Sequence, residues 1–262
     1  MFRFAANIST MFGEWSFLDR ISAASRAGFR AIECQWPYEF DVGDVANRLS
    51  DLDMPLILLN APKDDGKSPL FGMAAIPGFR NEFRRSVEYA AQYAEKTGCQ
   101  MIHILAGVPG DTVDHQHCRD IYIDNIQWAA TQLGRHSINV MLEAINTIDL
   151  PGYHIQGNDD LVDAIRATNC QNVRMQFDVY HSHQLGEDVF EVIEKCREFL
   201  GHVQVSGYPG RHEPVDGDIR FSSVFKHLDK LGYEGWVGCE YRPSSGTLDG
   251  LSWLEEYQSD AR

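Results

Sequence analysis

Four oxygen-bearing side chains follow one another along the second half of the chain at nearly regular intervals. They are Glu143, Asp178, Gln204 and Glu240, and their separations are 35, 26 and 36 residues. Each lies at or near the end of a short apolar run. Three carboxylates in one apolar opening would repel each other and be poorly solvated, a problem that a divalent cation resolves. Carboxylate and amide oxygens form a hard ligand set, so the pattern predicts one Mg²⁺ or Mn²⁺ rather than zinc.

These side chains can meet only if the apolar runs are neighbouring strands of one sheet. Eight runs of strand length occupy residues 2–8, 29–33, 55–60, 100–106, 138–144, 173–179, 202–206 and 236–241. Helix-like amphipathic segments alternate with them at residues 17–27, 42–52, 82–96, 120–133, 159–167, 187–199, 222–230 and 248–257. Strands that alternate with helices are typical of a parallel sheet. Eight units in 262 residues, about 33 residues each, predict an α/β protein with a single (β/α)₈ barrel domain over residues 1–262.

Helix ends and one long connection complete the predicted organisation. Asp41 and Asn158 have the type and place of N-cap residues. Glycines that follow the helical patterns suit the left-handed position after a helix, namely Gly28, Gly98, Gly134 and Gly232. Residues 61–78 form the longest loop, and a loop of that length is usually a lid or a binding segment. No Gly-rich phosphate fingerprint follows the first run, which disfavours a dinucleotide-binding fold.

In a (β/α)₈ barrel the functional groups gather at the carboxyl ends of the strands, so the four side chains are expected at one mouth. His181 stands three residues after Asp178 and could orient a ligand or contact the substrate. Arg211 follows the seventh run, and its planar guanidinium matches a substrate carboxylate. Glu213 could hold Arg211 or a neighbouring residue in place.

The charge balance excludes one broad class of partner. Acidic residues number 38 against 23 basic residues, for a formal charge of −15. A nucleic-acid-binding surface needs basic residues that displace counterions, so no nucleic-acid partner is expected. The sequence shows no signal peptide, no apolar stretch long enough to span a membrane and no Cys-x-x-Cys among its six cysteines. A cytoplasmic protein with reduced thiols is expected, and whether it forms a homo-oligomer stays open.

Several segments together resemble a known family. The chain is similar to the hydroxypyruvate isomerase branch of the xylose isomerase-like TIM barrels in FRFAANIST, AAIPG, LEAIN, PGYHI, GRHEP and GWVGCEYRP. The resemblance covers nearly the whole length, and the last three segments are specific. It implies one divalent cation held by the residues matching Glu143, Asp178, Gln204 and Glu240. It also implies that Glu143 and Glu240 are the proton donor and acceptor.

The reaction implied by this resemblance is the interconversion of hydroxypyruvate, a small 2-oxo acid, and tartronate semialdehyde through an enediolate. A hydride shift is the alternative route. INTIDLPGYH is nearer to hydroxypyruvate isomerases, whereas GRHEP-x-DG is nearer to 2-oxo-tetronate isomerases, so a three-carbon and a four-carbon substrate both stay open. Candidate residues for lining the substrate pocket are Asn60, Trp36, Phe12 and His154.

Three other functions compete with this interpretation. A sugar 3-epimerase would use the same fold, cation and paired acids on a larger sugar. An abasic-site nuclease would need several zinc ions, clustered histidines and a basic groove, which the acidic composition disfavours. A binding module without catalysis would lack one of the two acids, but Glu143 and Glu240 are both present.

Overall fold

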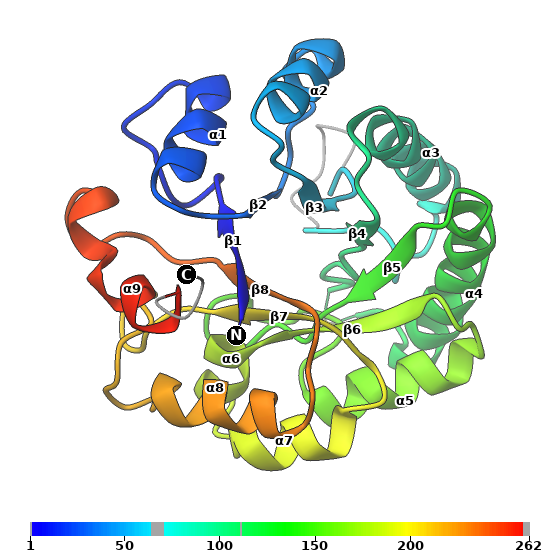
Figure 1. Cartoon of the computed structure of the whole chain (residues 1–262). Helices are drawn as coiled ribbons and strands as arrows, with labels where there is room; N and C mark the ends of the chain where they lie inside the picture. Colours follow the sequence, from blue (N-terminus) through cyan, green and yellow to red (C-terminus); the bar gives the residue numbers. More distant parts are fainter. Residues whose placement is uncertain (1, 64–70, 111, 259–262) are drawn as a thin grey trace.

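The computed structural model describes residues 2–63, 71–110 and 112–258. Across these ranges eight parallel strands close into a barrel in sequence order, with the last strand paired to the first (Figure 1). The strands are β1 (Arg3–Asn7), β2 (Ala31–Cys34), β3 (Leu56–Asn60), β4 (Met101–His103), β5 (Asn139–Leu142), β6 (Val173–Asp178), β7 (Leu200–Val205) and β8 (Trp236–Cys239). The predicted (β/α)₈ barrel is therefore confirmed.

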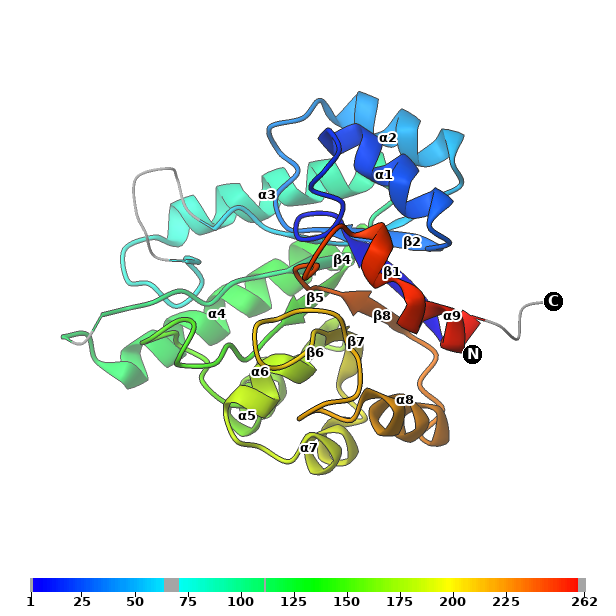
Figure 2. The ribbon, with the colours of Figure 1, turned by 90° about the vertical axis from the view of Figure 1, so that its left-hand side faces the viewer.

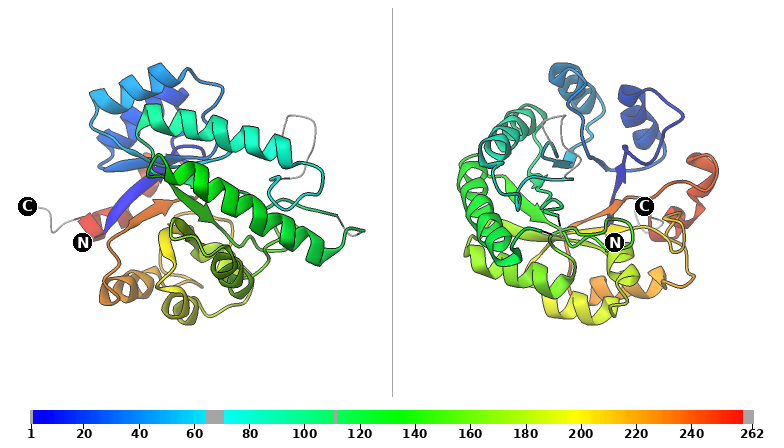
Figure 3. Two further views of the ribbon diagram at one scale, coloured as in Figure 1. Left: turned by 90° about the vertical axis from the view of Figure 1, so that its right-hand side faces the viewer. Right: turned by 180° about the vertical axis from the view of Figure 1, so that it is seen from behind.

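Helices form an outer ring around the strands, as the view along the barrel and the view from behind show (Figures 1 and 3). They are α1 (Phe17–Arg26), α2 (Val42–Asp51), α3 (Arg80–Thr97), α4 (His115–Gly134), α5 (Asn158–Thr168), α6 (Val179–Gln184), α7 (Val189–Cys196), α8 (Phe221–Lys230) and α9 (Ser252–Gln258), with a 3₁₀ turn η1 (Leu248–Gly250). The short α6 was not expected from the sequence. It directly follows β6, and the predicted helix 187–199 begins later, at Val189.

The interior of the barrel changes from apolar to polar along the strands. Ala5, Ala31, Leu58 and Met141 belong to one buried apolar cluster inside the sheet. Successive side chains alternate between the two faces of a strand, so the next inward positions lie two residues further on. Those positions hold polar residues that are also buried, namely Asn7, Glu33, Asn60 and Glu143. Inside the barrel an apolar layer is therefore followed, toward the carboxyl ends of the strands, by a polar layer.

The outer faces of the strands pack against the helices and form the larger core. Phe4 on β1 meets Trp253 on α9, with ring centroids 5.4 Å apart in an edge-to-face arrangement. Figure 2 shows α9 lying along β1 on the outside of the barrel.

No helix in the described ranges is long and apolar enough to cross a membrane. The six cysteines are free thiols.

The helix-end predictions are confirmed in part. The Asp41 side chain accepts hydrogen bonds from the backbone N–H groups of Gly43 and Asp44, as an N-cap does. Gly98 is the left-handed C-cap of α3, and Gly28 and Gly232 also have positive φ. Asn158 is not an N-cap, because α5 starts from Gly157 and the Asn158 side chain donates to Glu187 instead. Gly134 is the last residue of α4, with Arg135 as its C-cap.

The predicted long loop is described only at its two ends. Residues 64–70 of the stretch 61–78 lie outside the described residues. The backbone N–H of Gly72 donates to the carbonyl of Lys63 at 2.9 Å, so the two described ends lie together. The Lys63 ammonium lies over the Trp36 ring at 4.5 Å and over the Phe71 ring at 5.1 Å. Both rings line the cavity described next.

Candidate active site

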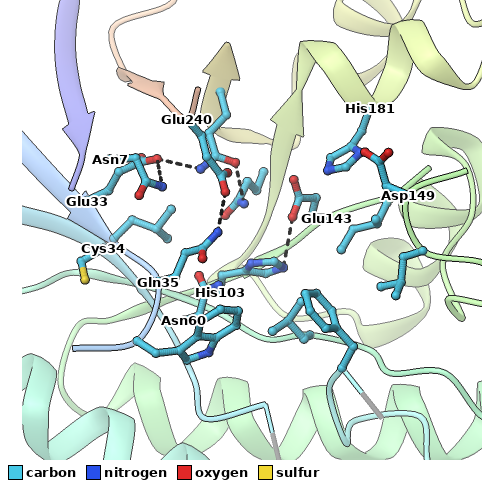
Figure 4. A pocket seen from close by; sticks show the side chains of 18 of the residues that line it. Asn7, Glu33, Cys34, Gln35, Asn60, His103, Glu143, Asp149, His181 and Glu240 are labelled. Carbon is cyan, nitrogen blue, oxygen red and sulfur yellow. Dashed lines mark hydrogen bonds and ion pairs between the residues drawn. The ribbon is translucent and has the colours of Figure 1, made fainter. Parts of the chain in front are cut away.

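A cavity of about 160 Å³ opens at the carboxyl ends of the strands. Within the described ranges, every strand or the residue directly after it contributes a polar side chain to its lining (Figure 4). In strand order these are Asn7, Glu33, Asn60, His103, Glu143, Gln176, Gln204 and Glu240. Pockets for drug-sized ligands are larger, about 300–1,000 Å³, so this cavity suits a small polar substrate.

Three buried groups lie close enough to share one cation. Glu143, Asp178 and His181 each offer a ligand atom, and these atoms all lie within 4.8 Å of one another. Asp178 ends β6, and its Oδ1 accepts a hydrogen bond from the backbone N–H of Tyr180 at 2.8 Å, which starts α6. Because α6 begins immediately, Nε2 of His181 comes to 3.7 Å from Oδ2 of Asp178. The short helix α6, which the sequence did not predict, therefore brings a possible nitrogen ligand for the cation next to the predicted oxygen ligands.

The two glutamates of the site are costly to ionise in the folded chain. Burial raises the pKa of Glu143 well above its ordinary value, and the charges of Asp178 and Glu240 raise it further. Oε1 of Glu143 is buried and has no hydrogen-bond partner among the described residues. Burial also raises the pKa of Glu240 to about 7, against the opposing effect of Arg211. A nearby cation would relieve both carboxylates, so the donor set fits the predicted divalent ion.

The remaining predicted ligand, Gln204, lies beside Asp178. The two residues are register partners on β7 and β6. Oε1 of Gln204 accepts a hydrogen bond from Nε2 of Gln176 at 2.8 Å, and Nε2 of Gln204 donates to Glu33 at 2.7 Å. Three of the four predicted residues, Glu143, Gln204 and Glu240, line the cavity. Asp178 is not part of the lining, but it contacts the lining residues His181 and Arg211.

Arg211 already has acidic partners inside the protein. Its Nη2 donates to Oδ2 of Asp178 at 3.0 Å and lies 4.0 Å from Oε2 of Glu240. Burial by itself would lower the pKa of Arg211, but these two carboxylates raise it. Of the two roles predicted for Glu213, the contact found is with a residue other than Arg211: its Oε1 accepts a hydrogen bond from the backbone N–H of Ser244. Glu213 is not among the described residues that line the cavity. The turn after β7 aims the two side chains differently, with Arg211 itself at a φ of 56°.

Two further residues, neither of them predicted from the sequence, lie against the glutamates. Nε2 of Gln35 donates to Oε1 of Glu240 at 2.6 Å, and Nε2 of His103 lies 3.6 Å from Oε2 of Glu143 (Figure 4). Burial, followed by His181 and His202, lowers the pKa of His103 to about 3, so its ring is neutral. In the structure Gln35 directly follows β2 and His103 ends β4. The predicted runs end at residues 33 and 106, so a strand-end position was an available signal for Gln35 but not for His103.

The predicted pocket-lining residues divide into two groups. Asn60 and Trp36 line the cavity. Phe12 instead packs in the core against Trp15 and Phe29.

His154 is buried away from the cavity lining, and its ring stacks on His115 with centroids 5.1 Å apart. The backbone explains this placement. The N–H of His154 donates to the carbonyl of Gly107, which pulls the segment toward the loop after β4.

Known proteins share this architecture and much of this sequence. A family model described as a xylose isomerase-like TIM barrel matches residues 21–257. The 2-oxo-tetronate isomerase of Cupriavidus necator is 39% identical over 255 residues, covering 97% of this chain and 98% of that protein. The hydroxypyruvate isomerase of Escherichia coli is 33% identical over 258 residues, covering 98% and 100%.

A solved structure described as an AP endonuclease, family 2, from Brucella melitensis superposes with a TM-score of 0.95. It is 39% identical and covers 98% of this chain and 99% of that one. The eight-stranded barrel, the polar cavity at its strand ends and these full-length similarities agree with one another. The chain belongs to the xylose isomerase-like TIM barrel family, and it is an isomerase of that family.

Proposed function

We propose that the protein is a divalent-cation-dependent isomerase of a short 2-oxo acid that carries a hydroxyl on C3. Hydroxypyruvate, converted to tartronate semialdehyde, is the substrate we place first. The observation that carries the proposal is the pair Glu143 and Glu240, two buried carboxylates that line one small cavity from positions directly after β5 and β8. An isomerisation by proton transfer needs one group that removes a proton and one that returns it, and this pair supplies both.

Glu143, Asp178, Gln204 and Glu240 would hold the cation, with His181 within reach of the same position. Mg²⁺ and Mn²⁺ both suit this oxygen-rich set. When bound, the cation would polarise the C2 ketone and so acidify the neighbouring C3–H. Two observations support this cation site. The charges of Asp178 and Glu240 act on Glu143, and Oε1 of Glu143 has no hydrogen-bond partner among the described residues.

The proton steps belong to the protein's own groups. One glutamate removes the proton from C3, which leaves an enediolate. A proton is returned to C2, and the proton of the C3 hydroxyl passes to the oxygen on C2. The ketone carbon thus becomes a CH–OH group and C3 a carbonyl, so atoms and charge balance. Gln35 restrains Glu240 through its hydrogen bond, and the neutral ring of His103 lies 3.6 Å from Glu143. Arg211, at the same mouth, would receive the substrate carboxylate.

A four-carbon substrate is the second candidate. 2-Oxo-tetronate undergoes the same proton transfer, with a CH₂OH group in place of one hydrogen on C3. The 39% identity to the 2-oxo-tetronate isomerase of Cupriavidus necator favours it. The two substrates differ in product, since the three-carbon acid yields an aldehyde, whereas the four-carbon acid yields an isomer whose single ketone lies on C3 instead of C2.

The two other enzyme classes are less well supported by the site. A sugar 3-epimerase would act on a larger substrate, which fits poorly in a cavity of about 160 Å³. An abasic-site nuclease must approach DNA phosphates, and a formal charge of −15 opposes that approach. The solved structure titled as an AP endonuclease makes nicking of abasic DNA a necessary control.

The test is an isomerisation assay on the chelator-treated protein with hydroxypyruvate, 2-oxo-tetronate, a ketohexose and abasic DNA, each with and without Mg²⁺ or Mn²⁺. We expect cation-dependent turnover of a 2-oxo acid and loss of about 10²–10⁴-fold in rate for Glu143→Gln and Glu240→Gln. In D₂O the product should carry deuterium at C2. Product with no solvent deuterium would contradict the enediolate route, and full activity of either variant would contradict the roles of the glutamates.

A further inference from the structure

Three polar side chains converge on Glu33 inside the barrel: Asn7 and Gln204, which line the cavity with Glu33, and His202, which does not. Glu33 is wholly buried on β2. Its Oε1 accepts hydrogen bonds from Nδ2 of Asn7 at 3.0 Å and from Nε2 of Gln204 at 2.7 Å. Its Oε2 lies 2.7 Å from Nε2 of His202. Figure 4 shows Glu33 and Asn7 together beside the cavity, near Glu240.

The chemistry of these partners gives each hydrogen bond a direction. A carboxylate oxygen accepts hydrogen bonds, and Nδ2 of Asn7 and Nε2 of Gln204 both donate to Oε1 of Glu33. Gln204 must therefore turn its NH₂ group toward Glu33. Its Oε1 then points away from Glu33 and accepts from Gln176. An amide oxygen has two lone pairs, so one lone pair of Gln204 is left after this bond.

The reversed amide would lose both of these hydrogen bonds. It would place the Gln204 oxygen against the Glu33 carboxylate and its NH₂ group against the NH₂ group of Gln176. We propose that Glu33 is a positioning residue, which sets the Gln204 amide so that its oxygen, and not its NH₂ group, faces the cation. This inference rests on the proposed function, because it assumes that Gln204 is a cation ligand.

The strand neighbouring Gln204 leaves room for this arrangement. Gly238 on β8 is the register partner of Gln204, and a Cβ added at Gly238 would lie 2.2 Å from Oε2 of Glu33. Any larger residue there would move the Glu33 carboxylate. Asn7 and Glu33 are themselves register partners on β1 and β2, so barrel closure delivers the four residues to one place.

The test measures Mn²⁺ affinity by electron paramagnetic resonance of the free ion, with circular dichroism to confirm that each variant is folded. Glu33→Leu removes the acceptor, and we expect about a 10- to 100-fold loss of Mn²⁺ affinity. Glu33→Gln keeps an oxygen for Gln204 and should restore much of that affinity. In a Gln204→Ala background, Glu33→Leu should cause no further loss, because the residue through which Glu33 acts is gone.

Glu33→Leu with unchanged affinity, or losses that simply add in the double variant, would overturn the positioning role. If Glu33→Leu does not fold, Gly238→Ala decides, since it moves the carboxylate without removing it. Weaker Mn²⁺ binding by Gly238→Ala supports the inference, and unchanged binding overturns it. A wild-type chain that binds no Mn²⁺ would overturn the proposed function and this inference together. Binding that depends on Gln204 but not on Glu33 would overturn only the inference.

Discussion

Nη2 of Arg211 donates a hydrogen bond to Oδ2 of Asp178 at 3.0 Å and lies 4.0 Å from Oε2 of Glu240. One guanidinium therefore bridges two acids that come from β6 and from the segment after β8. The side chain of Asp178 is 1% exposed and that of Arg211 is 23% exposed, so the bond is shielded from water. The same arginine lines the cavity, and we propose that it receives the substrate carboxylate.

Removing this guanidinium should destabilise the cation-free protein. Arg211→Ala leaves the buried charge of Asp178 without this partner, and breaking a buried pair costs about 3–5 kcal/mol. Added Mg²⁺ should recover much of the loss, because it supplies positive charge to the same acids. Urea unfolding with and without Mg²⁺ measures both effects. Arg166→Ala is the control, since its pair with Asp163 is exposed and should contribute under about 1 kcal/mol. Equal losses in the two variants would contradict this account.

The hydrogen bond from Gln35 should tune Glu240. The donated N–H stabilises the charged carboxylate and so lowers the pKa of Glu240, against the larger effect of burial that raises it to about 7. Gln35→Leu removes that donor, and the pKa of Glu240 should rise further. The acidic limb of the pH profile of kcat/KM should then move to higher pH. Gln35→Asn, which keeps an amide, serves as the matched control. An unshifted limb in Gln35→Leu would show that the contact does not affect the titration.

The stabilising effect of a cation should increase with pH. The pKa values of Glu143 and Glu240 are raised by folding, so the cation-free protein is most stable where both are protonated. That stability is lost as pH rises from the unfolded pKa through the folded pKa, which is about 7 for Glu240. A cation binds the ionised carboxylates. Its shift of the melting temperature at fixed Mg²⁺ concentration should therefore be larger at about pH 8 than at about pH 5. A shift that is constant with pH would argue against carboxylate ligands.

Replacement of His154 should leave catalysis intact. Both of its ring nitrogens are buried without a hydrogen-bond partner among the described residues, and burial lowers its pKa to about 4. The apolar ring in His154→Phe loses no hydrogen bond, so stability should stay the same or rise. Steady-state kinetics and thermal unfolding test this directly. A large fall in kcat/KM without unfolding would place His154 back in the substrate site.

The sequence alone was sufficient for the architecture and for the main acids of the site. Strands and helices differ in the period of their apolar residues, and that period is local information that survives without the fold. Glu143 and Glu240 were found because they directly follow strands, and strand ends in this fold share one mouth. Helix α6 escaped detection, since six residues carry too short a pattern.

Tertiary structure decided which side chains meet across the barrel. Glu33 and His202 are 169 residues apart, and Arg211 pairs with Asp178 rather than with nearby Glu213. Such contacts depend on barrel closure and strand register, because a shift of one residue would turn an inward side chain outward. The sequence and its local apolar period thus identified the residues that could do chemistry. Their hydrogen-bond partners were determined only by the closure of the eight strands into a barrel, as the described part of the chain shows.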